Sequence, residues 1–245
     1  MMNLLPDSMR ASAPFLKRYA GGMLIWSVIM SAVCLVLGYR YSFLWMQRDW
    51  GMFFDLILPH ATHLADGAMV GGVLGMVYAV KKPSISLSLL ISLLFVSLVI
   101  AILKNGIFPD WNRPASVFGE GDIRLLSLGN EKYRSFPSGH SAAAACLGWF
   151  GCLLFPARWW AFFTLALTIF MGWTRVYLGV HFPADVAVGL VVGLICAGAG
   201  SAVVRRIFPS GLPHTTIWRK VLFVLSFCCL MLGIFHTIDK YYLPL

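Results

Sequence analysis

Seven apolar runs, each long enough to cross a lipid bilayer, constrain this chain more than any other feature of its sequence. They lie near residues 23–39, 62–80, 85–103, 137–156, 159–176, 183–204 and 221–238. A transmembrane helix needs about 17–25 mostly apolar residues. Backbone polar groups in lipid are satisfied only within helices or closed barrels. We therefore expect an all-α fold, a polytopic bundle of transmembrane helices.

The composition excludes soluble, disordered and nucleic-acid-binding proteins. Hydrophobic residues make up 59% of the 245 residues, charged residues make up 12%, and mean hydropathy is +0.80. A soluble domain carries about 25% charged residues, and a disordered chain would be poor in the aromatic residues that form 14% of this one. The net charge of +9 comes with no basic cluster of the kind that binds nucleic acid. All six cysteines lie within apolar runs and are interpreted as packing residues.

The runs also suggest how the chain is divided. We expect a cytoplasmic or interfacial segment at 1–22, a transmembrane core at 23–204 with an outer loop at 104–136, and a cytoplasmic loop with an extra C-terminal span at 205–245. No signal-peptide cleavage site follows the first run, so we expect it to be retained. If successive spans cross the membrane in opposite directions, three basic pairs lie on the same side of the membrane as the N-terminus: Lys81-Lys82, Arg205-Arg206 and Arg219-Lys220. The positive-inside rule then places the N-terminus in the cytoplasm and the C-terminus outside.

Small residues recur four positions apart in two of the runs. They are Gly67, Gly71 and Gly75 in one and Gly189, Gly193 and Ala197 in the other. This spacing allows helix backbones to approach closely, so we expect both spans to lie inside the bundle.

Three polar clusters stand where a membrane protein rarely tolerates polar residues. They are Lys104 with Arg113-Pro114, then Pro137-Ser138-Gly139-His140, then Thr174-Arg175 with His181 and Asp185. Each lies at the outer end of a predicted span. Because the chain reverses direction at every span, we expect all three clusters to meet at the outer face.

The residue types in these clusters favour binding of a phosphate. Arg113 and Arg175 carry guanidinium groups that match phosphate oxygens, and Lys104 adds a point charge. Pro137 suits the first turn of a helix. Backbone N–H groups near Ser138 and Gly139 would then point at an anion, with the Ser138 hydroxyl as a further donor. Because cationic side chains supply the positive charge, we expect no metal and no other cofactor.

Two histidines add the groups that a reaction needs. His181 and Asp185 are four residues apart, so on a helix the carboxylate could orient the imidazole and raise its basicity. The second ring nitrogen would then be the nucleophile or base. His140 lies beside the expected phosphate site and could protonate the leaving group.

Together the three clusters resemble the signature of the type 2 phosphatidic acid phosphatase superfamily, which includes bacterial membrane lipid phosphatases. Its motifs are Lys, six residues, Arg-Pro; then Pro-Ser-Gly-His; then Ser-Arg, five residues, His, three residues, Asp. The likeness covers residues 104–185 of this chain. It departs at two points, because eight residues separate Lys104 from Arg113 and because Thr174 replaces the serine.

The resemblance implies six family-like spans and a role for each matching residue. His181 would form a phosphohistidine, Asp185 would orient it, and His140 would be the general acid. The phosphate would be bound by Lys104, Arg113, Ser138, Gly139 and Arg175. Thr174 and Asp66 are candidates for supporting roles. Asp66 lies near the outer end of the second predicted span, where it would either meet a site cation or the substrate or serve as structural polar packing.

The sequence therefore predicts a metal-independent membrane lipid phosphatase that hydrolyses a lipid phosphomonoester or diphosphate. We expect it in the bacterial inner membrane with its site facing the periplasm. Two alternatives remain open: a phosphotransferase that uses a polyprenyl diphosphate donor, and a protein that binds or transports phosphorylated lipid without turnover. The sequence does not choose among undecaprenyl diphosphate, lipid A, phosphatidylglycerophosphate and phosphatidic acid, and it does not indicate an oligomeric state.

Overall fold

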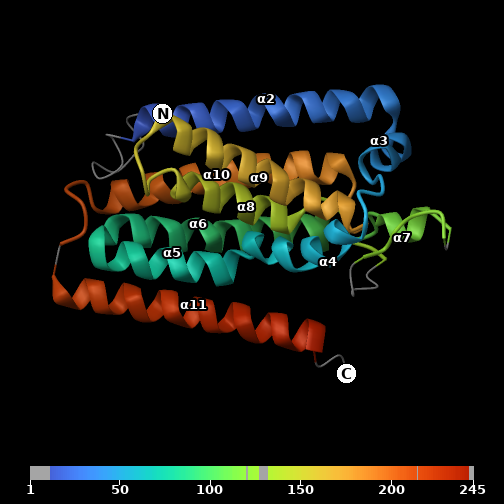
Figure 1. The fold of residues 1–245 in the computed structure, drawn as a ribbon. Coiled ribbons are helices and arrows are strands. Elements are labelled where there is room, and N and C mark those ends of the chain that lie inside the picture. Colours follow the sequence, from blue (N-terminus) through green and yellow to red (C-terminus); the bar gives the residue numbers. More distant parts are fainter. Residues whose placement is uncertain (1–11, 120, 127–131, 214, 243–245) are drawn as a thin grey trace.

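A computed structural model describes residues 12–119, 121–126, 132–213 and 215–242 (Figure 1). Within these residues the regular elements are all helical. The α-helices are α2 (Ala13–Leu37), α3 (Tyr39–Met46), α4 (Met52–Ala61), α5 (Gly67–Lys81), α6 (Pro83–Ile102), α7 (Pro114–Val117), α8 (Gly139–Gly151), α9 (Arg158–Tyr177), α10 (Pro183–Ile207) and α11 (Thr216–Tyr242). A 3-10 turn, η2 (Thr62–Ala65), precedes α5, and a π-helical turn, η3 (Leu103–Ile107), continues α6.

One α-helix overlaps most of each of the seven predicted runs, namely α2, α5, α6, α8, α9, α10 and α11. Among the described residues, four helices are long and apolar enough to cross a membrane by themselves: α2, α6 with η3, α10 and α11. The stretch Met52–Lys81 makes a fifth candidate if it is one span, bent by 54° before Gly67. The chain is therefore an integral membrane protein, and the part that the structure describes holds four to five candidate spans. The other two helices fall short because α8 has 13 residues and α9 carries tryptophan, threonine and arginine.

The first long helix begins before the first predicted run. Helix α2 begins at Ala13, with Pro14 in its first turn, so residues 13–22 are helical, and the expected division of the chain at residue 22 stays a prediction. Proline is well tolerated at the start of a helix because the N–H it lacks has no partner there. The rest of the expected segment, residues 1–11, lies outside the described residues.

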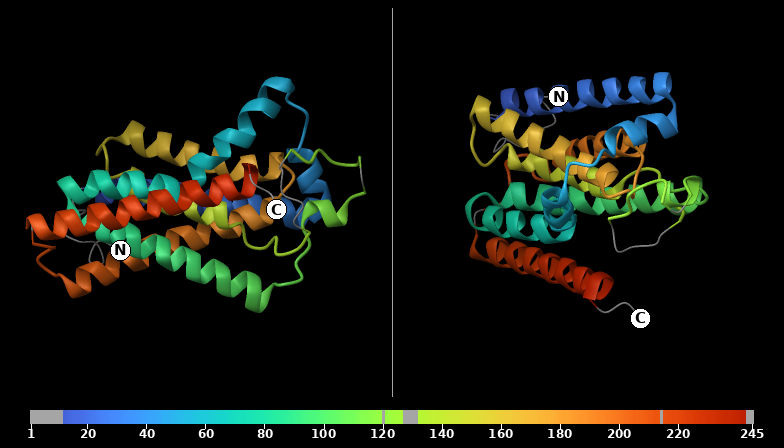
Figure 2. Two further views of the ribbon diagram at one scale, coloured as in Figure 1. Left: turned by 90° about the horizontal axis from the view of Figure 1, so that it is seen from below. Right: turned by 45° about the vertical axis from the view of Figure 1, so that its right-hand side comes forward.

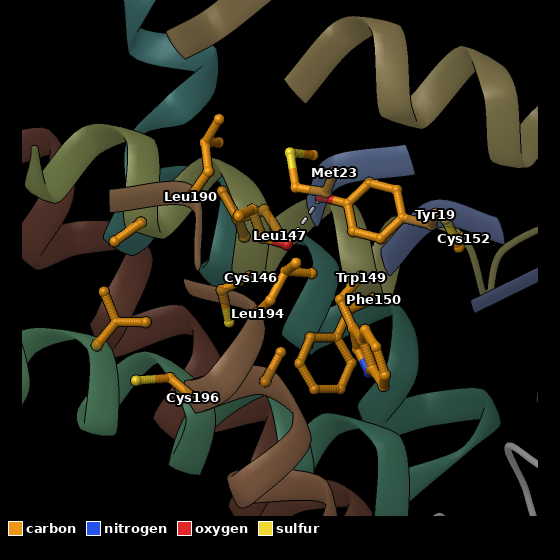
Figure 3. Close-up of a cluster of buried hydrophobic side chains, with 14 of the residues drawn as sticks. Tyr19, Met23, Cys146, Leu147, Trp149, Phe150, Cys152, Leu190, Leu194 and Cys196 are labelled. Carbon is orange, nitrogen blue, oxygen red and sulfur yellow. Dashed lines mark hydrogen bonds between the residues drawn. The ribbon is translucent and has the colours of Figure 1, made fainter. Parts of the chain in front are cut away.

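The long helices run up and down beside one another, and α8 occupies the interior (Figures 1 and 2). Figure 3 shows Tyr19 and Met23 of α2 beside side chains of α8 and α10. The Tyr19 hydroxyl donates to the Ala145 carbonyl at 2.9 Å, which satisfies a polar group in an apolar core. Helices α8 and α10 approach so closely that a Cβ on Gly193 would lie 2.1 Å from the Ala142 carbonyl oxygen. The expectation that the small residues of α10 permit close packing is confirmed.

The short helices gather at one end of the bundle. Helices α3, α4 and α7 all lie toward the right of Figure 1, at the end where α6 and α9 end and α8 and α10 begin. The three polar clusters belong to these same helix ends. The predicted convergence of the clusters at one face of the bundle is therefore confirmed, whereas the side of the membrane stays a prediction.

Candidate active site

The histidine and aspartate of the third cluster meet at the turn between α9 and α10. Helix α9 ends at Tyr177 and α10 begins at Pro183, so His181 lies in the turn and not on a helix as expected. Its Nδ1 is 3.5 Å from Asp185 Oδ2. The carboxylate is held over the first turn of α10 because the Phe182 backbone N–H donates to Oδ2 at 2.9 Å. Both side chains are buried, with exposures of 2% for His181 and 0% for Asp185.

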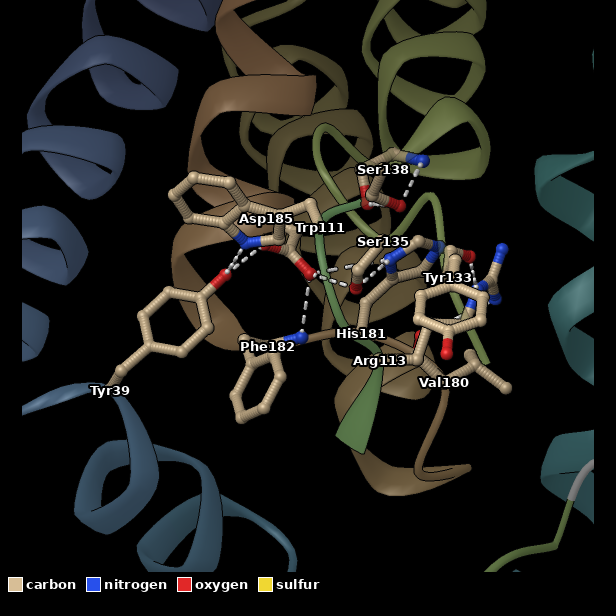
Figure 4. A network of polar contacts seen from close by, with 11 residues as sticks. Tyr39, Trp111, Arg113, Tyr133, Ser135, Ser138, Val180, His181, Phe182 and Asp185 are labelled. Atoms are coloured by element: carbon tan, nitrogen blue, oxygen red, sulfur yellow. Dashed lines mark hydrogen bonds and ion pairs between the residues drawn. The ribbon is translucent and has the colours of Figure 1, made fainter. Parts of the chain in front are cut away.

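A serine that the sequence analysis did not single out completes this pair (Figure 4). The Ser135 hydroxyl donates to Asp185 Oδ2 at 2.5 Å and lies 3.4 Å from His181 Nδ1. The single hydroxyl proton of Ser135 points to the Asp185 carboxylate, so the Ser135 oxygen and Asp185 Oδ2 are both acceptors for Nδ1 of His181. The proton of a neutral His181 therefore belongs on Nδ1, which leaves the Nε2 lone pair for a substrate.

A tyrosine from the N-terminal part of the chain holds the other carboxylate oxygen. The Tyr39 hydroxyl, at the start of α3, donates to Asp185 Oδ1, and the Trp111 indole N–H donates to the Tyr39 oxygen at 3.0 Å. Burial raises the pKa of Tyr39, and the negative charge of Asp185 raises it further. The hydroxyl therefore stays protonated and remains a donor. Trp111 therefore belongs to this network.

The two predicted arginines are both buried and held by hydrogen bonds. Arg113 is buried; its Nε donates to the Tyr133 carbonyl at 3.0 Å and its Nη1 to the Val180 carbonyl at 3.4 Å. Arg175, in the last turn of α9, donates from Nη1 to the Thr62 hydroxyl at 2.8 Å. These contacts fix the direction of both guanidinium groups before any ligand binds.

Thr174 uses its hydroxyl inside the bundle. It donates to the Met171 carbonyl at 2.6 Å and meets the Thr62 hydroxyl at 3.2 Å. Because Thr62 also accepts from Arg175, Thr174 contacts a hydrogen-bond partner of that arginine, and its expected supporting role stays a prediction. Thr62 lies in η2, far from the three clusters in sequence, and no motif indicated it.

Burial lowers the pKa of the His181 imidazole well below its usual range. Positive charges nearby lower this pKa further, in order of effect those of Arg113, Lys104, Arg175 and His140. The direction of the net shift is opposite to the one expected from Asp185 alone. It keeps the imidazole neutral, which is the form that can act as a nucleophile. It also shows that side chains from all three clusters act electrostatically on one ring.

Lys104 lies in the π-helical turn η3 and is partly buried. A π-helical turn holds more residues than an α-helical turn. It therefore takes up part of the extra length between Lys104 and Arg113, and the lysine charge still acts on His181.

The second cluster forms the N-terminus of α8. Ser138 is the N-cap, and its hydroxyl accepts from the Ser141 N–H at 3.3 Å and from the Ser141 hydroxyl at 2.8 Å. Pro137 thus precedes the cap, and the expectation that it lies in the first turn is wrong. Gly189 of α10 gives this N-cap the space it needs, because a Cβ at position 189 would lie 2.4 Å from the Ser138 carbonyl oxygen. Gly139 and His140 are the first helical residues, so their N–H groups are among those without intrahelical partners.

Asp66 is the N-cap of α5. Its Oδ1 accepts from the Ala68 and Met69 backbone N–H groups, each at 2.9 Å. Helix capping is a structural reason for an acid at the end of an apolar span, because the carboxylate satisfies two backbone N–H donors. A role toward substrate stays a prediction.

Within the described part of the chain, no group of three or more His, Cys, Asp or Glu side chains could hold a metal ion. Among those residues the site presents cations and hydroxyls around a neutral histidine. Such a constellation can bind an anion and attack it with nitrogen. The expected metal independence stays a prediction.

Known proteins share both the sequence pattern and the fold. A sequence model described as the PAP2 superfamily matches residues 85–209. The lipid A 1-phosphatase of Rhizobium johnstonii is 43% identical over 65 residues, which are 26% of this chain and 26% of that relative. A protein of Escherichia coli, YbjG, whose name provisionally assigns it undecaprenyl-diphosphatase activity, is 29% identical over 132 residues, 54% of this chain and 64% of its own. The chain thus spans about a quarter of the length of the first relative and under two thirds of the second.

One solved structure shares the fold. The crystal structure of Aquifex aeolicus LpxE superimposes with a TM-score of 0.56 at 24% identity, covering 64% of this chain and 91% of that one.

Proposed function

This chain belongs to the PAP2 superfamily, and on that premise we propose that it is a lipid phosphatase that hydrolyses a lipid phosphomonoester or diphosphate through a phosphohistidine. The observation that carries the proposal is the buried imidazole of His181, whose Nδ1 lies 3.5 Å from Asp185 Oδ2 and whose neighbour in sequence, Val180, accepts from the Arg113 guanidinium. A protein that only binds a phosphorylated lipid would need the cations but no nucleophile. A neutral histidine with its proton held on Nδ1 adds a nucleophile.

The reaction would proceed in two steps. In the first, Nε2 of His181 attacks phosphorus, the N–P bond forms, and the bond to the lipid oxygen breaks. His140 gives the leaving oxygen its proton. Charge moves onto the phosphoryl oxygens, where Lys104, Arg113 and Arg175 stabilise it. In the second step water attacks phosphorus and gives a proton to His140, the N–P bond breaks, and inorganic phosphate leaves, so that both histidines return to their starting forms.

Asp185 has its largest effect in the first step. As the N–P bond forms, positive charge develops on the His181 ring, and a buried carboxylate 3.5 Å from Nδ1 stabilises that charge. Ser135 and Tyr39 hold the carboxylate in place. Their part in the reaction is positioning, because neither needs to touch the substrate.

The substrate would be a phosphorylated lipid of the outer leaflet of the bacterial inner membrane. The alternation of the helices supports this orientation, because the basic pairs lie at the helix ends opposite to the site: Lys81-Lys82, Arg205-Arg206 and Arg219-Lys220. Basic residues of this kind are retained in the cytoplasm. The names of the two relatives favour lipid A and undecaprenyl diphosphate among the substrates to be tested.

The test is phosphate release by the purified protein from lipid A, undecaprenyl diphosphate, phosphatidylglycerophosphate and phosphatidic acid. His181→Ala is expected to abolish release and any acid-labile phosphoenzyme, while the exposed His60→Ala serves as the matched control. His140→Ala is expected to lose about 10²–10⁴-fold on lipids and to keep more activity on p-nitrophenyl phosphate, whose leaving group needs little protonation. Transfer to a lipid acceptor without phosphate release would identify a transferase. Binding without turnover by the wild-type protein would refute the proposal.

A further inference from the structure

A cavity of about 530 Å³ lies beside the candidate active site, between α5, α6, α8 and α11. On α6 its lining extends from Leu90 to Ile100, which corresponds to about 15 Å along the helix axis. Most of the lining is apolar. The polar exceptions include Asp66, Ser97 and His140. The general acid of the proposed reaction therefore lies in the wall of a long hydrocarbon-lined space.

Helix α11 forms one wall, through Cys229 and Leu232. This helix lies beyond residue 209, where the match to the family ends. It is nevertheless fixed tightly to α5. A Cβ on Gly72 would lie 2.6 Å from the Leu230 backbone nitrogen, and a Cβ on Gly233 would lie 2.7 Å from the Met69 nitrogen. Glycines at a helix contact bring backbones together in this way, so the wall is a built part of the bundle.

The cavity is not sealed from the surroundings of the bundle. Leu94 on α6 is 56% exposed and Leu232 on α11 is 68% exposed, and both belong to its lining. The two helices are candidate membrane spans. Their exposed apolar side chains face lipid, so the gap between them opens to the interior of the bilayer.

We propose that this cavity is the binding site for one hydrocarbon chain of the phosphorylated lipid substrate, with walls from α5 and α11 that lie outside residues 85–209, the part of the protein that matches the family. The proposal rests on the proposed function. The hydrocarbon chain of the lipid would enter between α6 and α11 and lie along α6. This position brings the head group of the lipid to His140. A polar ligand is disfavoured because the lining offers few partners for it.

The benefit of this site is positional. A hydrocarbon chain in the bilayer is already in apolar surroundings, so its entry into the cavity gains little from the hydrophobic effect. The shape of the cavity instead limits where the phosphate can lie, and misplacement of a reacting group by about 1 Å can cost about 10²-fold in rate. Filling the cavity should therefore impair long-chain substrates and spare short ones.

The first test compares dioleoyl with dihexanoyl phosphatidic acid. Cys229→Trp and Leu232→Trp are each expected to lower kcat/KM on the long-chain lipid by about tenfold to hundredfold and to change kcat/KM on the short-chain lipid less than about twofold. Leu225→Trp is the matched control, because Leu225 is a half-exposed residue of α11 outside the cavity lining. Equal losses on both lipids, as a structural lipid or a packing role would give, or no loss in either variant, would overturn the proposal.

The second test is independent of activity. Phosphatidic acid with a diazirine at the end of one acyl chain is photolysed in liposomes that hold the protein, and labelled residues are found by mass spectrometry. Leu93 and Ala143 line the cavity and are 9% and 8% exposed, so label on them reports a chain inside. Leu232→Trp should abolish that label, and label confined to exposed residues would refute the site. If the wild-type protein hydrolyses none of the four lipids named under the proposed function, that function fails, and labelling still decides whether the cavity holds a hydrocarbon chain.

Discussion

Removal of the Tyr39 hydroxyl tests whether a residue outside the three motifs contributes to the reaction. Tyr39→Phe deletes the donor to Asp185 Oδ1 and leaves Ser135 and the Phe182 N–H on Oδ2. A hydrogen bond to a charged group contributes about 1.5–3 kcal/mol, and 1.4 kcal/mol corresponds to about tenfold in rate. If the whole loss falls on the transition state, kcat decreases by about 10- to 100-fold.

The expected pattern is a fall in kcat with KM changed less than about twofold, because Tyr39 orients Asp185 and does not face the phosphate. Tyr41→Phe, on the same helix and 75% exposed, is the matched control. A double-mutant cycle with Asp185→Asn separates positioning from folding. In the Asp185→Asn background, Tyr39→Phe should cost little further activity, since the charged partner is gone.

The measurement is steady-state phosphate release from the best lipid substrate, with thermal unfolding of each variant recorded beside it. A kcat for Tyr39→Phe within about twofold of the wild-type value would refute the positioning role. Full additivity of the two substitutions would refute it as well, because independent sites add. A lowered melting temperature with unchanged kcat would show that the hydroxyl stabilises the fold alone.

Three further outcomes are expected. Activity should survive EDTA and be inhibited by vanadate, and complete loss in EDTA with recovery in Mg²⁺ would contradict a site built on cationic side chains. Burial and then the charge of Arg113 lower the pKa of His181, so the acid limb of kcat/KM should lie below about pH 6.5, the usual histidine pKa. Arg113→Gln should raise the pKa of His181, so that activity is lost at a higher pH as pH falls. An acid limb that does not move in this variant would contradict the assignment. For orientation, a cysteine placed at exposed Ser116 in a cysteine-free background should react with an impermeant thiol reagent in intact spheroplasts. A cysteine placed at exposed Ser210, at the opposite end of the bundle, should react only after permeabilisation. The reverse pattern would place the site in the cytoplasm.

The sequence determined the helices and the end of the bundle at which the chemistry lies. Apolar runs mark membrane helices because unpaired backbone groups are costly in lipid. Helices that alternate in direction bring Lys104, His140 and Arg175 to one face whatever the details of packing. The spacing of His181 and Asp185 predicted their contact, although the contact forms across a turn and the first residues of α10.

The tertiary structure alone decided which side chains complete the site and how it is charged. Tyr39 reaches Asp185 across 146 residues of sequence, and Thr62 reaches Arg175 across 113, because the N-terminal helices pack against the ends of α9 and α10. No local pattern encodes such contacts. The direction of the His181 pKa shift follows from burial and from a sum of charges over distances in space. Hydropathy therefore specifies where the helices lie along the chain, and their packing specifies the chemistry at their ends.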